Sequence, residues 1–170
     1  MEKKVLATVV FLVMSSAQPC RAQWHRQVMA DAMSDKQYIV YELQTTGESE
    51  TAGQLTFSCE KGEISRVLLR TSGGLPFRQA TISGSYLRAG GSYMTDFRIR
   101  VGDDKPISLY GELTPNLLAL DVKERKSRMA KWFAAGRLRF ETFDGSNTGH
   151  ILEFSLTIPM DFQKECGTLN

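Results

Sequence analysis

The sequence predicts a mainly β protein of the β-rich α+β class: one antiparallel, β-sandwich-like domain with one amphipathic helix, a C-terminal hairpin and a short C-terminal helical turn. Several short runs alternate between apolar and polar residues and are bounded by turn residues, which is typical of half-buried strands. One run alone has helical spacing. No linker or repeat divides residues 23–170, so we expect a single domain there.

The first residues, 1–22, have the layout of a secretory signal peptide. Charged residues at 2–4 precede an apolar run at 5–14, and small and polar residues follow at 15–22. The apolar run is too short to span a bilayer, so we expect no transmembrane anchor. The signal predicts export to a periplasmic or secreted location.

Two cleavage points satisfy the small-residue rule, one after Ala17 and one after Ala22. We expect the second, with Gln23 as the mature start, because Pro19 ends any helix before it. A lipid anchor on Cys20 is a weaker alternative, since the residues before it are not of the type that lipid attachment requires.

The charge balance argues against a nucleic-acid partner. The whole chain carries a net charge of +2, but residues 1–22 hold three basic residues and one acidic residue. Their removal leaves a mature chain near zero, without the basic excess that neutralises phosphates.

Strands are predicted at 38–43, 54–59 and 64–70 in the first half of the chain. The last two are joined by a turn at 61–63 and form a hairpin. Strict alternation within 54–59 directs the Cys59 side chain toward the core.

The middle of the chain is less regular. The glycine-rich residues 71–91 are expected to be loose, with a strand near 78–87. Alternation returns at 95–101, a turn follows at 102–106, and a strand resumes at 107–110.

The helix is predicted from Val122 to Ala135, with Asp121 as the N-cap and Gly136 as the stop. Its apolar face is formed by Val122, Met129, Trp132, Phe133 and Ala134.

The clearest hairpin follows, with strands at 137–143 and 150–157 around a turn at 144–149. Pro159 can then open a helical turn that carries Cys166.

An even number of cysteines remains after cleavage, which favours a Cys59–Cys166 disulfide in an exported chain. Closing so long a loop lowers the entropy of the unfolded chain and can stabilise the folded state by up to roughly 4–5 kcal/mol. Two separate buried thiols are the alternative. A zinc site is disfavoured because no histidine lies near either cysteine.

Catalytic and metal-binding motifs are missing from the sequence, and we predict no catalytic residue, no metal site and no cofactor. His25 and His150 are not paired with a second ligand at metal spacing. There is no nucleophile elbow and no phosphate-binding loop. Asp103 and Asp104 lie in a turn sequence. A glycosidase carboxylate pair assembled from distant residues remains an alternative.

The predicted helix is the one strongly charged segment. Its basic residues and the arginine that follows are Lys123, Arg125, Lys126, Arg128, Lys131 and Arg137. Arg125, Arg128 and Lys131 are the candidate partner-binding residues, for an acidic partner, a cell-wall polymer or an anionic lipid. The alternative is an ordinary solvated helix face.

A wider pattern spans most of the mature chain. Trp24 lies near its start, and residues 31–35, Leu55–Cys59, Arg98–Pro106 and the C-terminal Cys166 follow in order. This order resembles the small periplasmic proteins of the VasI (TagO) type associated with type VI secretion, and related uncharacterised exported bacterial proteins. More faintly, its opening is similar to the invasion-associated locus B family.

The resemblance implies a β-sandwich-like body with a helix, a bacterial envelope location and an accessory role without catalysis. It implies no functional residue, and the glycine-rich stretch at 71–91 departs from it. We therefore expect an exported accessory protein that binds an envelope protein or a cell-wall polymer. The alternatives are an inhibitor of a wall-lytic enzyme such as lysozyme, and a cell-wall glycan hydrolase.

Overall fold

The computed structural model describes residues 24–30, 36–47, 49–72, 77–79, 81–82, 85–86, 88–89, 91–114, 117–120 and 126–167. The expected signal peptide and its cleavage points lie outside the described residues, and so do Asp121 and Val122 at the expected start of the helix.

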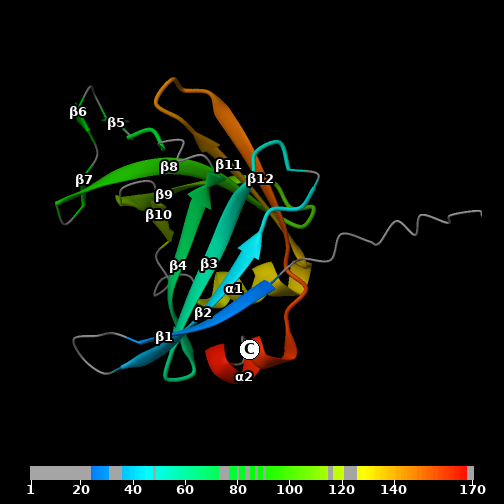
Figure 1. Cartoon of the computed structure of the whole chain (residues 1–170). Helices are drawn as coiled ribbons and strands as arrows, with labels where there is room; N and C mark the ends of the chain where they lie inside the picture. Colours follow the sequence, from blue (N-terminus) through cyan, green and yellow to red (C-terminus); the bar gives the residue numbers. More distant parts are fainter. Residues whose placement is uncertain are drawn as a thin grey trace, which may run out of the picture.

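Strands dominate the described chain and two short helices complete it, which confirms the predicted β-rich α+β class (Figure 1). The long strands of the first half are β1 (Trp24–Ala30), β2 (Gln37–Gln44), β3 (Gly53–Glu60) and β4 (Glu63–Thr71). Those of the second half are β8 (Ser92–Val101), β9 (Ile107–Thr114), β10 (Leu117–Leu120), β11 (Arg137–Phe143) and β12 (Gly149–Ser155). The helices are α1 (Lys126–Ala135) and α2 (Met160–Cys166).

Within the described residues, nine strands follow one another across a single antiparallel sheet in the order β1-β2-β3-β4-β10-β9-β8-β11-β12, and the short β7 (Arg88–Ala89) adds a tenth beside β8. The chain leaves β4, forms the β8-β9-β10 meander, and returns so that β10 pairs with β4. Helix α1 then carries the chain from β10 to β11, on the other side of β8. Strands distant in sequence are therefore neighbours in the sheet.

The stretch at 78–87 differs from the single strand that we expected. It contains the two-residue strands β5 (Thr81–Ile82) and β6 (Ser85–Tyr86), which pair with each other outside the main sheet. β7 (Arg88–Ala89) then pairs with the start of β8. Glycine and serine at 83–85 favour a turn over a continuous strand, which accounts for the difference.

Alternation places the core on one face of the sheet. In β3, Leu55, Phe57 and Cys59 are buried, and the residues between them are partly exposed. The sheet bends so that its two ends face each other across this core. Gly53 of β3 packs directly against Leu152 of β12, although the two strands are far apart in the sheet order. This is the sandwich-like arrangement that we expected.

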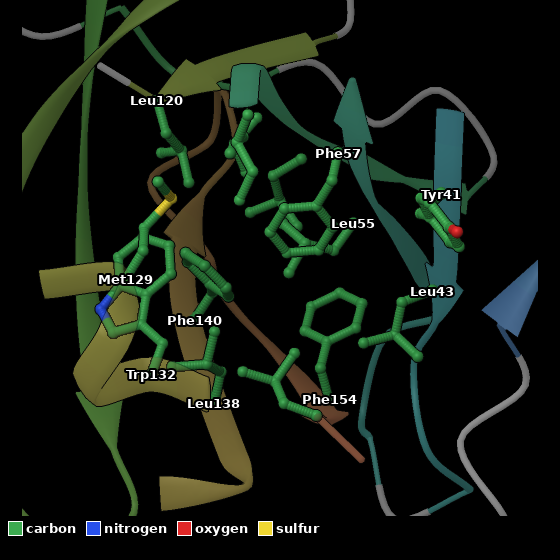
Figure 2. Packing of buried hydrophobic residues seen from close by; sticks show 14 of the residues in the cluster. Tyr41, Leu43, Leu55, Phe57, Leu120, Met129, Trp132, Leu138, Phe140 and Phe154 are labelled. Atoms are coloured by element: carbon green, nitrogen blue, oxygen red, sulfur yellow. The ribbon is translucent and has the colours of Figure 1, made fainter. Parts of the chain in front are cut away.

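Helix α1 covers part of the core with three residues of the predicted apolar face, whereas Ala134, which we also placed on that face, is exposed. Met129, Trp132 and Phe133 are all buried, and Figure 2 shows Met129 and Trp132 beside Phe140 of β11. Helix α2 adds Phe162, which is fully buried and whose ring centroid lies 5.3 Å from that of Phe133. The two helices therefore meet at the core.

Gly53 should be intolerant of any side chain. A Cβ atom there would lie 2.2 Å from Leu152 Cδ2 and 2.7 Å from the carbonyl oxygen of Arg70, which is backbone and cannot rotate away. We expect Gly53→Ala to lower the free energy of unfolding by about 1–3 kcal/mol, as overpacking does. Urea denaturation measures this change. Gly145→Ala, where a Cβ atom meets nothing within 4 Å, is the control, and equal stability of both variants would contradict the close approach.

Candidate functional site

The end of β3 is joined covalently to α2. Cys59 and Cys166 form a disulfide with a Cα–Cα distance of 5.1 Å, and both residues are buried. This is the pairing that the cysteine count predicted. It holds the C-terminal helix against the sheet.

An ion pair with a shared carboxylate lies beside this disulfide. Glu165 accepts hydrogen bonds from Arg26 Nε at 2.8 Å and from Arg26 Nη2 at 2.6 Å. Its Oε2 atom also accepts a hydrogen bond from the Tyr41 hydroxyl at 2.5 Å. The three residues come from α2, β1 and β2, so this contact ties the edge strand to the last helix.

These contacts change the acid–base behaviour of the group. The hydrogen bonds from Arg26 and Tyr41 stabilise the carboxylate and lower the pKa of Glu165 below its ordinary value. Burial and the neighbouring carboxylate raise the pKa of Tyr41 to about 12. Glu165 is thus held ionised and Tyr41 neutral at physiological pH, which suits a structural contact better than proton transfer.

Trp24 completes what we call the C-terminal clasp: the disulfide, the Arg26–Glu165–Tyr41 contact and Trp24. The indole Nε1 atom donates a hydrogen bond of 2.7 Å to the carbonyl oxygen of Thr157. The ring lies 5.4 Å from Phe162 and 5.7 Å from Phe57, centroid to centroid. The clasp therefore fixes both ends of the described chain to the same corner of the sheet.

The aspartates and histidines that could take part in catalysis are held by other contacts, in turns and on strands. Asp144 accepts hydrogen bonds from the backbone amides of Ser146 and Thr148, each at 2.9 Å, and its Oδ2 atom lies 2.9 Å from His150 Nε2. These contacts lower the pKa of Asp144. Asp103 is almost fully exposed and forms an ion pair with Arg137.

Within the described ranges, no group of three or more His, Cys, Asp and Glu side chains is placed to hold a metal ion. His25 lies on β1, where its Nδ1 atom is 3.0 Å from the side-chain Nε2 atom of Gln27.

The predicted basic surface of the helix is only partly described. Lys131 is exposed on α1. Arg128 belongs to α1, but its side chain is not among those described, and Arg125 lies outside the described residues. Of the three candidate side chains, only that of Lys131 is among those described, so the role of these residues in binding stays a prediction.

A groove of about 750 Å³ crosses the outer face of β2, β3 and β4, opposite the core. Short outward side chains of the middle strand, Thr56 and Ser58, contribute to its lining. Register places Val40 of β2 and Arg66 of β4 on either side of Ser58, and places Leu68 of β4 beside Thr56. The groove therefore forms because the short side chains of β3 lie between longer side chains of β2 and β4. The remaining lining residues are Ala30, Lys36, Gln37, Tyr38, Glu60 and Ser65.

No single stretch of the sequence predicts this groove. The alternation of 54–59 already directs Thr56 and Ser58 outward, but the walls come from other strands. Val40 lies on the outer face of β2 and is only 9% exposed. The groove is therefore lined by an apolar side chain as well as by hydroxyl groups. Only the pairing of three strands reveals that arrangement.

Comparisons with protein-family models, with curated proteins and with solved structures found no match to this chain. The resemblance to the VasI type accordingly stays a prediction. In the described part of the chain, neither helix is long and apolar enough to cross a membrane.

The disulfide should contribute strongly to stability. We expect Cys59→Ser or Cys166→Ser to lower the free energy of unfolding by roughly 2–5 kcal/mol, because the bridge restricts the unfolded chain. Thermal unfolding with and without reductant measures the loss. Thiol labelling of the denatured, unreduced protein is the direct check, and two reactive thiols would contradict the bridge.

The contribution of Glu165 should depend on pH. Because folding lowers its pKa below 4.5, the carboxylate stabilises the fold above that pH, and the gain is lost as the pH falls through the lower, folded-state value. We expect Glu165→Gln to destabilise the protein most at neutral pH and progressively less in acid. Thermal unfolding from neutral pH to pH 3 tests this, with Glu112→Gln on the exposed face of β9 as the control. A difference that is constant with pH would argue against the ionised contact.

Proposed function

We propose that this chain is an exported, non-catalytic accessory protein of the bacterial envelope, which binds another macromolecule through the groove over β2, β3 and β4. The observation that carries the proposal is the groove itself. Its volume lies within the range of ligand-binding sites, and it lies on the outer face of the sheet, where its residues are not needed for the core.

The lining of the groove suits an extended polymer. Thr56 and Ser58 alternate along β3 and offer hydroxyl groups at the spacing of every second strand residue. Tyr38, Val40 and Leu68 add apolar surface, and the charges of Lys36 and Arg66 are opposite to that of Glu60. A peptide segment of an envelope protein or a strand of cell-wall polymer offers the matching polar groups and apolar faces.

Export is supported by two independent features. Residues 1–22 have the composition of a signal peptide, and the Cys59–Cys166 disulfide is of the kind that persists in oxidising compartments. The association with type VI secretion comes from the sequence resemblance alone. Secretion-apparatus genes beside this gene would support it.

A second candidate function is the inhibition of a wall-lytic enzyme, and the turn between β11 and β12 favours it. Residues 145–149 are exposed, and the side chain of Asp144 holds the turn through the amides of Ser146 and Thr148. A loop fixed before binding loses little conformational freedom when it enters a cleft. Lysozyme activity measured with and without the protein separates this function from groove binding.

The groove can be tested by filling it. Ser58→Gln enlarges a side chain on the middle strand of the groove without touching the core, so we expect roughly tenfold weaker capture of envelope components, as the loss of a well-packed contact implies. Ser72→Gln, an exposed serine outside the groove, is the matched control.

The measurement is a pull-down from envelope extract and co-sedimentation with purified cell wall, with circular dichroism to confirm folding. Equal capture by wild type and both variants would remove the groove from the binding site. No capture by the wild type from either source would argue against the proposed function as a whole.

A further inference from the structure

Strands β8 and β11 are neighbours in the other half of the sheet (Figure 1). Alternation places four of their arginines on its outer face, opposite the buried residues. We call them the arginine row. They are Arg98, Arg100, Arg137 and Arg139. They lie on strands that contribute nothing to the groove.

Three of the four are paired with carboxylates. Arg98 lies 3.1 Å from Glu141, and Arg137 lies 2.8 Å from Asp103. Arg139 donates to Glu153 Oε2 from its Nε atom at 2.9 Å and from its Nη2 atom at 2.5 Å. The side chain of Glu153 is only 5% exposed, so Arg139 is held in place by a buried carboxylate.

Arg100 is different, because it has no ion pair among the described residues and its side chain is exposed. Register places it directly opposite Arg139. Like charges directly opposite each other across two strands are destabilising. Arg139 cannot relieve the repulsion by turning away, since Glu153 would then be buried without a partner. The fold therefore places the guanidinium group of Arg100, which has no ion pair among the described residues, next to that of Arg139, which Glu153 holds in position.

Two adjacent guanidinium groups form a good site for a carboxylate, because each can donate hydrogen bonds in a planar, two-pronged geometry. The surroundings favour a protein as the source of that carboxylate. Tyr110 on β9 is 51% exposed and faces outward next to Asp96, two residues along β8 from Arg98. Arginine and tyrosine are enriched at the centres of protein–protein interfaces.

We propose that Arg100, flanked by Arg98 and Arg139, binds an acidic segment of a protein partner on the outer face of β8, β9 and β11. This surface is separate from the groove, so the inference goes beyond the proposed function and survives if the groove binds nothing.

The test is a titration with a fluorescein-labelled hexaglutamate peptide at low and at physiological salt, followed by fluorescence anisotropy. We expect the wild type to bind at low salt and more weakly at higher salt. Arg100→Gln should weaken binding roughly tenfold through the loss of one charge-assisted contact, and Arg100→Glu should abolish it. Arg70→Glu, an exposed arginine on β4 outside both surfaces, should bind like the wild type.

Equal binding by wild type and Arg100→Glu would overturn the proposal, and so would an equal loss in Arg70→Glu, which would indicate attraction by total charge alone. A parallel titration uses phosphatidylglycerol vesicles. Arg100-dependent binding to the vesicles without binding to the peptide would assign the surface to a membrane and also overturn the proposal.

Melting temperature separates binding from a structural role. Arg100→Gln removes a repulsion, so it should melt at the wild-type temperature or above it. Arg139→Gln leaves Glu153 buried and unpaired, so it should melt well below the wild type. A lowered melting temperature for Arg100→Gln would show that Arg100 supports the fold and would overturn the proposal.

Discussion

The contact on which the rest of the structure depends is the aromatic packing around Phe162. This residue comes from the last helix, yet its ring meets those of Trp24 on β1, Tyr41 on β2, Phe57 on β3 and Phe133 on α1. It is fully buried, so all of its surface contributes to the hydrophobic stabilisation of these elements. The disulfide and the Arg26–Glu165–Tyr41 contact then fix the helix in the position that this packing requires.

The core and the two proposed binding surfaces occupy opposite faces of the same strands. β3 buries Leu55 and Phe57 on one side and exposes Thr56 and Ser58 to the groove on the other. β8 likewise buries Phe97 and Ile99, and carries its arginines outward. Because strand side chains alternate, outward residues can change without disturbing the core. Outer residues without a buried partner, unlike Arg139, are therefore available for the proposed recognition.

Local patterns in the sequence predicted much of the fold. The alternation of 54–59, the hairpin at 137–157 and the apolar face with Met129 and Trp132 each depend on neighbours in sequence, and each was confirmed. β1 was missed because Trp24–Ala30 does not alternate, and its position depends on contacts with α2 at the far end of the chain. The groove and the arginine row were missed for a related reason. Both are set by cross-strand register, which is absent from any single stretch of sequence.

The C-terminal clasp also determines when the native state becomes accessible. Because the last helix supplies Phe162, Glu165 and Cys166, the corner that joins β1, β2 and β3 is incomplete until the final residues are present. A chain that emerges slowly from a ribosome or a translocation pore would thus remain only partly folded until its end is released. For the proposed export, this order of events would suit passage through a narrow channel, which requires an unfolded chain, and would leave disulfide formation to the oxidising compartment beyond it.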